Sequence, residues 1–469
     1  MDDVTFIILG ATGNLTKKKL LPAIYHLIEN KKIKKFSIIG VARNKTKAEI
    51  ILNKSKRYIK KIKPKVWKEL EKNFHYLPLD FYQEEKFCSL DPFVKNIEKK
   101  NKLSGNRLFY LATLPQHFPV IAKTLKKCAL TKENQNKKGK NNWVRAVFEK
   151  PFGHDLKSAK KINKTIKKVF KEKQIYRIDH YLGKELIQNI AITKFTNTFL
   201  EPLLNNKYVD HVQLILSENV GIEERGPFYD KYGVIRDVIQ NHMMQMLSLS
   251  TMEKPKKLSG NYIRDEKVKI LKAVKTTKEL VVGQYIGYKK EKGIPKNSKT
   301  ETFAATKLFV NNKRWKKVPF YLITGKKMKS KMTSVYFQFK KAQCLDINNR
   351  CDFKANYLTV QIQPEEGYYL QMNAKVPGEE KVTAVKMDFC HACTFGPNTP
   401  AAYETLLEDI VEGDQSSFVR TDEIEQQWKI TDKITKLKKT LHKYKIGTYP
   451  KQADKLIKKD NRNWHLIVK

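Results

Sequence analysis

Residues 5–16, with the sequence Thr-Phe-Ile-Ile-Leu-Gly-Ala-Thr-Gly-Asn-Leu-Thr, decide the fold. The first five residues predict a strand, and a turn containing Gly10 and Gly13 follows at once. Apolar side chains then recur at helical spacing over Lys17–Glu29, and Phe36–Val41 predicts a second strand. A strand, a glycine turn, a helix and a strand within about forty residues predict the opening of a βαβ unit.

The same alternation continues as far as residue 178. Further strands are predicted at Leu108–Ala112 and Trp143–Phe148, and a Lys- and Asn-rich segment, 131–142, predicts a surface loop. Helical stretches lie between the strands, over residues 46–74, 117–130 and 155–173. Alternating strands and helices favour a parallel sheet with helices on both faces. We therefore predict a Rossmann-like, doubly wound dinucleotide-binding domain over residues 1–178.

The chain after residue 178 has a different pattern. Helices are predicted over 184–198 and 236–252, and a strand over Val209–Val220. Several strand-like runs then follow one another between residues 280 and 395 without intervening helices, which predicts one large, mostly antiparallel sheet. Residues 401–445 are predicted to be helical again. Residues 179–469 are thus expected to form a second, β+α domain.

The composition excludes several classes of protein. The 469 residues carry 93 Lys and Arg against 48 Asp and Glu, a formal charge of +45, yet 41% apolar residues are too many for a disordered chain. No apolar run approaches the roughly 18 residues that span a bilayer, and the acidic start is not a signal peptide. Six cysteines do not form a disulfide framework. We therefore expect a cytoplasmic protein in reducing conditions, without a membrane partner.

The positive charge comes almost entirely from lysine, with 81 Lys and 12 Arg spread along the chain. Proteins that read nucleic acid favour Arg for its planar, bidentate fork, so no specific nucleic-acid partner is expected. A lysine-rich face is usually a solvated face. We expect non-specific attraction to polyanions at low salt and a field that favours phosphorylated substrates.

The turn Gly10-Ala11-Thr12-Gly13-Asn14-Leu15 lies where a dinucleotide phosphate would bind, between a strand and a helix. Glycine lets the backbone approach a pyrophosphate, and the helix N-terminus offers free N–H groups. The spacing is not the full G-x-G-x-x-G, and taken alone a bare tight turn explains it equally well. The second strand, however, is followed by Arg43, which suits a 2′-phosphate, where an acid would suit a free 2′-hydroxyl. The sequence therefore favours NADP over NAD.

Polar and charged residues that could take part in catalysis or binding are concentrated in three later segments, Glu149–Gly153, Arg177–Lys184 and Arg236–His242. The Lys150–Pro151 bond in the first is a candidate cis corner. The second places Asp, His, Tyr and Lys within six positions at a strand-to-helix junction, and the third opens an apolar helix. Each feature alone also fits a core histidine, a helix cap or a solvated lysine. Together they offer a carboxylate, a base and cations for an anionic substrate.

These motifs resemble those of the glucose-6-phosphate dehydrogenase family. The matching stretches keep the family's order from residue 5 to near the C-terminus: G-A-T-G-N-L-T, E-K-P-F-G, R-I-D-H-Y-L-G-K-E, I-R-D-V-I-Q-N-H, V-P-F-Y-L-I-T-G-K-K and A-Y-E-T-L-L-E-D-I. The resemblance implies a Rossmann domain followed by a β+α domain whose large sheet serves dimerisation, so a homodimer or homotetramer is expected. It also implies oxidation of glucose 6-phosphate at carbon 1 to 6-phosphoglucono-1,5-lactone, with hydride transfer to NADP.

The resemblance further implies roles for individual residues. The general base would be His242, and its partner carboxylate would be Asp179. The ligands of the sugar phosphate would be His180, Tyr181 and Lys184, and those of the sugar hydroxyls and ring Glu218, Asp237, Lys326 and Lys331. The dinucleotide would lie on Gly10–Leu15 and Arg43, Lys150 would lie between substrate and cofactor, and no metal is implied. The chemistry agrees, because an imidazole can take the hydroxyl proton while a carboxylate orients the ring.

The sequence departs from the family's pattern on the cofactor side. Asn14 stands where Asp is usual, Thr12 where Ser is common, and Leu114 replaces the first Pro of a Pro-Pro pair, leaving Pro115. These departures bear on cofactor affinity more than on the reaction. One alternative is a dehydrogenase of another sugar or sugar phosphate on the same fold, and the retained phosphate ligands disfavour an unphosphorylated sugar. The other is a non-enzymatic, polyanion-binding relic, which the complete His–Asp–Lys set disfavours.

The cysteines raise a separate question. Cys390 and Cys393 have C-x-x-C spacing, and Cys344 and Cys351 lie upstream, so a zinc site or a redox pair is one interpretation. The upstream pair has the wrong spacing for zinc, and the resemblance implies no metal here. We expect Cys390 and Cys393 to be small apolar fillers.

Overall fold

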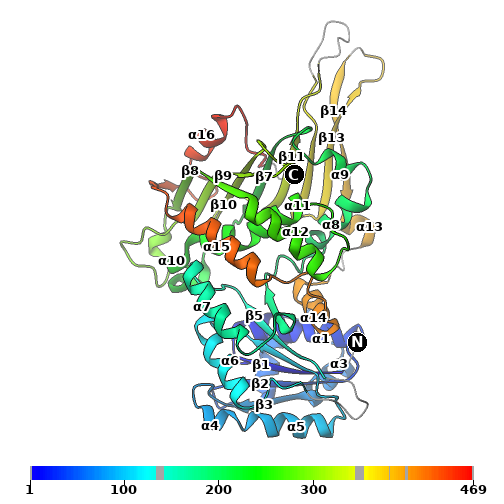
Figure 1. Cartoon of the computed structure of the whole chain (residues 1–469), viewed down its shortest axis with the longest axis vertical. Coiled ribbons are helices and arrows are strands. Elements are labelled where there is room, and N and C mark those ends of the chain that lie inside the picture. The colour runs from blue at the N-terminus through cyan, green and yellow to red at the C-terminus, as the bar shows by residue number, and fades with distance from the viewer. Residues whose placement is uncertain (1–2, 134–141, 344–352, 380, 397–399, 467–469) are drawn as a thin grey trace. The chain divides into compact units, whose positions relative to one another are not determined.

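The computed structural model describes residues 3–133, 142–343, 353–379, 381–396 and 400–466 (Figure 1). The chain divides into two compact units. Unit 1 comprises residues 1–184, 259–264 and 400–425, and unit 2 comprises residues 185–258, 265–399 and 426–469. The predicted loop 131–142 and the pair Cys344 and Cys351 lie largely or wholly outside the described residues.

Unit 1 is built on a six-stranded, fully parallel sheet with the order β3-β2-β1-β4-β5-β6. Its strands are β1 (Val4–Leu9), β2 (Phe36–Ala42), β3 (Phe74–Pro78), β4 (Arg107–Leu111), β5 (Val144–Glu149) and β6 (Ile175–Ile178). All six residues of β1 are buried, as expected for a central parallel strand. This is the strand order of a dinucleotide-binding Rossmann fold, and it confirms the predicted fold class.

Helices cover this sheet, and most fall where the apolar spacing predicts them. They are a π-helical turn (Thr16–Leu20), α1 (Leu21–Glu29), α2 (Ala48–Lys56), α3 (Pro64–Asn73), α4 (Glu84–Phe87), α5 (Leu90–Lys100), α6 (Phe118–Lys127) and α7 (Leu156–Lys167), with short 3-10 turns at Pro115–His117 and Glu172–Gln174. The predicted stretch 46–74 is two helices, because Pro64 begins a new one.

Unit 1 also takes in a segment from far along the chain. Helix α14 (Ala402–Glu412) packs on α1, and Leu406 and Ile410 are buried in the same core as Val4. Gly183 allows this packing, because a Cβ there would lie 2.5 Å from the carbonyl oxygen of Ala402. The predicted division at residues 178 and 179 stays a prediction.

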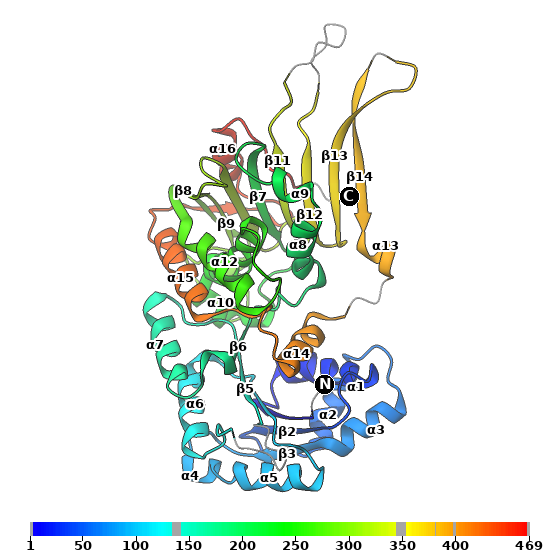
Figure 2. The ribbon, with the colours of Figure 1, turned by 45° about the vertical axis from the view of Figure 1, so that its right-hand side comes forward.

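Unit 2 contains a nine-stranded sheet with the order β14-β13-β12-β11-β7-β10-β9-β8-β15 (Figure 2). All neighbours are antiparallel except β7 with β10 and β8 with β15. The strands are β7 (Val209–Ser217), β8 (Val274–Tyr285), β9 (Phe303–Val310), β10 (Pro319–Gly325), β11 (Met332–Phe339), β12 (Tyr357–Gln363), β13 (Gly367–Lys375), β14 (Val382–Cys390) and β15 (Leu441–Tyr444). The large, mostly antiparallel sheet is confirmed, although the sequence did not predict β13 or β15.

The other elements of unit 2 are helical. They are α8 (Glu185–Thr196), α9 (Leu200–Leu203), α10 (Gly226–Val234), a π-helix (Ile235–Met243), α11 (Met244–Thr251), α13 (His391–Phe395) and α16 (Gln452–Lys458), with 3-10 turns at Glu223–Arg225 and Tyr288–Lys290; α12 (Gly260–Ala273) and α15 (Thr421–Thr435) begin in unit 1. The π-helix contacts β7 and β10. It starts after a kink at Gly233, whose φ of +69° suits glycine.

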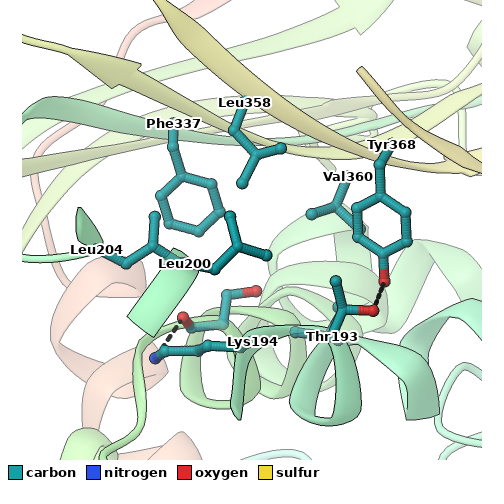
Figure 3. Close-up of a pocket in the computed structure, with 10 residues that line it drawn as sticks. Thr193, Lys194, Leu200, Leu204, Phe337, Leu358, Val360 and Tyr368 are labelled. Atoms are coloured by element: carbon teal, nitrogen blue, oxygen red, sulfur yellow. Dashed lines mark hydrogen bonds between the residues drawn. The ribbon is translucent and has the colours of Figure 1, made fainter. Parts of the chain in front are cut away.

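A buried lysine fixes α8 against the rest of unit 2 (Figure 3). The Lys194 ammonium donates to the carbonyl oxygens of Ser250 (3.1 Å) and Met252 (2.7 Å), at the end of α11. The neighbouring Thr193 hydroxyl lies 2.8 Å from that of Tyr368 on β13. Burial lowers the pKa of Lys194 to about 7. These bonds anchor the helix that follows the predicted phosphate-binding motif.

The cysteines differ from the prediction. Cys390 and Cys393 form a disulfide, with Cα atoms 5.2 Å apart, and so do Cys88 and Cys128. The expectation that Cys390 and Cys393 are apolar fillers is therefore wrong, and for Cys88 and Cys128 the sequence predicted no pairing. The C-x-x-C pair spans the junction of β14 and α13, which brings its Cα atoms into disulfide range.

Within the described ranges, no helix is long and apolar enough to cross a membrane.

Candidate active site

The glycine turn after β1 has the geometry that a dinucleotide needs. Gly10 has a φ of +97°, and a Cβ there would lie 2.5 Å from the carbonyl oxygen of Ala112. The Gly13 N–H donates to the Gly10 carbonyl oxygen (3.0 Å), which also accepts from the Thr16 hydroxyl (3.2 Å). Gly40 on β2 lets Ala11 pack closely, because a Cβ at Gly40 would lie 2.9 Å from that of Ala11. The turn is thus held rigidly at the carboxyl end of the sheet, next to a helix N-terminus.

Arg43 is exposed at the end of β2, where the sequence predicts a ligand of the 2′-phosphate. Its neighbours come from two other connections. Burial, together with the charge of Arg43, lowers the pKa of His117. The His117 Nδ1 lies 2.7 Å from the Tyr82 hydroxyl oxygen. Tyr82 and His117 are not among the predicted site residues, although both follow strands at the edge where dinucleotides bind.

The segment after β5 brings together a carboxyl group and two phenols. The hydroxyls of Tyr110 and Tyr403 donate to Glu149 Oε1 at 2.5 and 3.1 Å. Burial raises the pKa of Glu149 to about 7, so this carboxyl group titrates near neutral pH. The following Lys150–Pro151 bond is cis, as predicted. In this segment the predicted site residue is Lys150 alone, since nothing local in the sequence connects Glu149 with Tyr403.

The motif 179–184 forms a compact turn between β6 and α8. Asp179 is buried, and its Oδ1 accepts from the Tyr181 N–H (3.1 Å). The Lys184 ammonium lies 4.3 Å from the centre of the Tyr181 ring, and the rings of His180 and Tyr181 are 5.0 Å apart. The three predicted phosphate ligands are therefore adjacent side chains, as the sequence predicts.

A buried arginine on β6, paired with Glu172, precedes this motif in the chain. Arg177 lies on β6 with its side chain buried and donates to Glu172 Oε1 (2.6 Å) and to the Thr421 hydroxyl (2.9 Å). Although burial opposes it, Arg177 lowers the pKa of Glu172 to about 2. The guanidinium thus fixes the strand from which the motif emerges.

The predicted sugar ligands of unit 2 meet at one edge of the large sheet. Because β7 and β10 are parallel neighbours, with Ser217 opposite Gly325, the next residues, Glu218 and Lys326, emerge side by side. The Lys326 ammonium donates to Glu218 and lies 3.6 Å from Asp237 Oδ2. Lys326 and Asp237 are buried, whereas the Glu218 side chain is 28% exposed, so water reaches this cluster of one cation and two carboxylates from the Glu218 side.

Backbone and side-chain contacts hold the cluster in place. The Glu218 N–H donates to Gly325 O (2.9 Å), and the Tyr444 hydroxyl of β15 donates to Lys326 O (2.7 Å). Lys331 precedes β11, whose first residue pairs with Ser217, so it lies at the same edge, but its side chain is exposed.

His242 lies on the π-helix that also carries Asp237. In a π-helix the i→i+5 spacing makes slightly more than one turn, so Asp237 and His242 lie on successive turns of one face. His242 is 3% exposed, and its N–H donates to Asn241 Oδ1 (2.6 Å). Asp179 belongs to unit 1 and His242 to unit 2, and their pairing stays a prediction.

Unit 1 therefore has the fold and turn of a Rossmann-type dinucleotide-binding protein, joined to a second unit with a polar, partly buried sheet edge. Two family models match the chain, "glucose-6-phosphate dehydrogenase, NAD binding domain" over residues 7–189 and "glucose-6-phosphate dehydrogenase, C-terminal domain" over residues 191–465. The chain belongs to the glucose-6-phosphate dehydrogenase family.

Individual relatives agree with the family models. The chain is 40% identical to glucose-6-phosphate 1-dehydrogenase of Chlamydia pneumoniae, over 98% of this chain and 95% of the relative. It is 39% identical to the enzyme of Bacillus subtilis, over 98% and 97%. A solved glucose-6-phosphate dehydrogenase in complex with its substrate glucose 6-phosphate is similar with a TM-score of 0.89 and 32% identity, over 99% of this chain and 98% of the other.

Proposed function

We propose that this protein oxidises glucose 6-phosphate at carbon 1 to 6-phosphoglucono-1,5-lactone, with NADP as the hydride acceptor. The observation that carries the proposal is the turn 179–184, where His180, Tyr181 and Lys184 are adjacent. A phosphate needs several donors and a cation at one place, and this turn supplies them. The similar solved structure with bound glucose 6-phosphate supports the same assignment.

The turn after β1 fits the pyrophosphate of a dinucleotide. The close approach of Gly10 to Ala112 leaves no room for a side chain, so nothing at this position would keep a phosphate away from the turn and the helix N-terminus that follows it. The exposed guanidinium of Arg43 suits the 2′-phosphate that distinguishes NADP from NAD. When bound, the nicotinamide accepts the hydride from carbon 1.

In unit 2, Glu218, Asp237 and Lys326 would hold the sugar hydroxyls and ring oxygen. Their mutual ion pairs fix the side chains before the sugar arrives, so little rotamer entropy is lost on binding. We assign Lys331 to the same group with a looser role, because its exposed side chain is not fixed in advance.

Proton removal is assigned to His242. A neutral imidazole within hydrogen-bond reach of the carbon 1 hydroxyl takes its proton as the hydride leaves. We assign to Asp179 the task of orienting the ring and stabilising the imidazolium that forms. We place Lys150, at the cis corner after β5, between substrate and cofactor.

Comparing glucose 6-phosphate with glucose tests the proposal. The phosphorylated sugar should be the far better substrate, because His180, Tyr181 and Lys184 would bind its phosphate. In Lys184→Gln, kcat/KM for glucose 6-phosphate should fall roughly 10- to 100-fold, as expected for losing one charged hydrogen bond, while the low value for glucose should not change. Lys173→Gln, an exposed lysine outside the motif, is the matched control. Equal kcat/KM for both sugars in the unmodified protein would end the assignment.

For assembly, we propose a homodimer formed through β13 and β14. Met372 and Val385 pair across these strands, Met387 lies two residues further along the same face, and the three side chains are 42%, 39% and 57% exposed. A contiguous exposed apolar face of this kind usually marks an interface. Met387→Lys should lower the mass measured by light scattering, whereas Ile50→Lys, at an exposed apolar residue of unit 1, should not. A mass of four chains for the unmodified protein in the same measurement would indicate a homotetramer instead.

The cytoplasmic location stays a prediction.

A further inference from the structure

Helix α7 of unit 1 carries a row of lysines without acidic partners on the helix. Its twelve residues include five lysines and no Asp or Glu. Lys160, Lys164 and Lys168 follow one another at spacings of four, so they lie on one face. Among the residues that the structure describes, these three form no ion pair. Each like-charged pair at this spacing destabilises a helix by about 0.2–0.5 kcal/mol, so the helix carries a repulsion that a bound anion would relieve.

The same lysines line a pocket of about 510 Å³ between α7 and the first residues of α15, and all the residues that line it belong to unit 1. Its lining residues are Lys160, Asn163, Lys164, Lys167, Lys168, Thr421 and Glu425. The pocket is widely open to solvent, so it would hold an extended, charged ligand along its surface and would not enclose a compact one. The lining contains four lysines and one carboxylate, so its net charge is positive. One of these lysines, Lys167, lies 3.7 Å from Glu172 Oε2 and is partly neutralised by it.

Asn163 adds a second, independent feature. Its side chain lines the pocket and is 3% exposed, and in the described part of the chain its amide nitrogen has no hydrogen-bond partner. Leaving a buried donor unsatisfied costs roughly 1–3 kcal/mol. The nitrogen itself is shielded from the pocket, so the amide has to rotate before an acceptor there can satisfy it, and phosphate oxygens are acceptors without donors of their own.

We propose that this pocket binds a chain of phosphate groups, as found in inorganic polyphosphate or in the tail of a nucleoside triphosphate. The helical rise of 1.5 Å per residue places Lys160 and Lys168 about 12 Å apart along the axis, which is too long for one phosphate group. Separate lysines act as point charges along such a chain. The site is distinct from the dinucleotide turn and from the turn 179–184, so it goes beyond the proposed activity.

Calorimetric titration with tripolyphosphate, in the presence of saturating NADP, tests the site. The full-length protein should bind one tripolyphosphate per chain, and pyrophosphate and phosphate should bind progressively more weakly. The triple variant Lys160→Gln, Lys164→Gln, Lys168→Gln should lose at least tenfold in affinity. The control variant Lys65→Gln, Lys68→Gln, Lys72→Gln removes the same charge from exposed positions of α3 and should lose less than twofold.

Replacing tripolyphosphate by ATP separates the two sources. Binding of ATP at least as tight as that of tripolyphosphate assigns the site to a nucleotide tail, and weaker binding assigns it to inorganic polyphosphate. Equal losses in the two triple variants would show only diffuse attraction to the net charge and would overturn the proposal, as would the absence of saturable binding. Asn163→Asp, which places a negative charge in the pocket, should abolish binding, and an unchanged affinity in a variant with an unchanged melting curve would also overturn it.

Discussion

The dinucleotide turn of unit 1 and the sheet edge of unit 2 are built in opposite ways. The turn and Arg43 lie within about forty residues of sequence, and the cofactor's proposed ligands are backbone groups and one exposed cation. The sheet edge joins Glu218 and Asp237 to Lys326, which lies 108 positions after Glu218, and this cation is 2% exposed. A local, exposed site can lose a ligand without unfolding, whereas a non-local, buried ion cluster also stabilises the fold.

The largest effect should come from the base in unit 2. His242→Asn keeps a hydrogen-bonding side chain but removes the proton acceptor, so turnover should fall by roughly two to four orders of magnitude. KM for glucose 6-phosphate should change little, because the turn 179–184 is untouched. Turnover is measured beside a melting curve. If His242 were only a packing residue, the variant would melt earlier but turn over normally per folded molecule.

The ion cluster should respond in both stability and binding. In Lys326→Met the carboxylates of Glu218 and Asp237 lose their shared cation, which should lower the free energy of unfolding by up to about 3 kcal/mol, since the buried Asp237 loses one of its cationic partners and keeps Arg225 at 3.9 Å. KM for glucose 6-phosphate should rise as well. The double variant Lys326→Met, Glu218→Gln should recover part of the stability but not the KM. Lys329→Gln, an exposed neighbour before β11, is the control for both measurements.

The same contrast decides what the sequence could predict. Thr5–Leu9, the glycine turn and Phe36–Val41 are neighbours along the chain, and their order is enough to indicate a βαβ unit. The juxtaposition of Glu218 with Lys326 depends on the parallel pairing of β7 with β10 inside a mostly antiparallel sheet. No periodicity in either strand indicates that pairing, so only the family resemblance placed these residues in one site.

Other features lay beyond sequence reasoning for the same reason. Tyr403 reaches Glu149 from 254 positions away, because α14 returns to pack on unit 1. The disulfide between Cys88 and Cys128 joins residues 40 positions apart, without a spacing signature. Strand β15 was predicted as helix, since four residues paired with β8 carry too little pattern to be recognised.

On the exposed side of the comparison, Arg43→Ala should weaken binding without destabilising the fold. NADP affinity should fall by about 1.5–3 kcal/mol, as for one charged hydrogen bond, while NAD affinity should hardly change. Titration of each nicotinamide cofactor into the variant and the parent measures this. Lys45→Ala, an exposed cation two residues further on, is the matched control. Equal losses for NADP and NAD would show that Arg43 is structural and would remove the main support for NADP.

The smallest effect concerns Asp409 on α14, the helix from residues 402–412 that packs into unit 1 although the rest of that unit comes mainly from the first 184 residues. Burial, followed by the nearby carboxylates of Asp414, Glu408 and Glu412, raises the pKa of Asp409 from 3.8 to about 7. Between these values the folded protein keeps a proton that the unfolded chain has lost, so the contribution of Asp409 to stability falls as pH rises from about 4 to 7.

Asp409→Asn removes this dependence while keeping an oxygen that can accept from Ser417. The variant and the parent should therefore melt at nearly the same temperature near pH 4.5. At pH 8 the variant should be more stable, by on the order of 1 kcal/mol, because the half-buried carboxylate no longer has to ionise on the folded protein. Glu412→Gln removes an exposed charge from the same helix and should produce a much smaller difference at pH 8.

A variant that is less stable than the parent at both pH values would mean that Asp409 is held as a partnered carboxylate. In that case α14 would be joined to unit 1 by an ionic contact and not, as its buried Leu406 and Ile410 indicate, mainly by apolar packing.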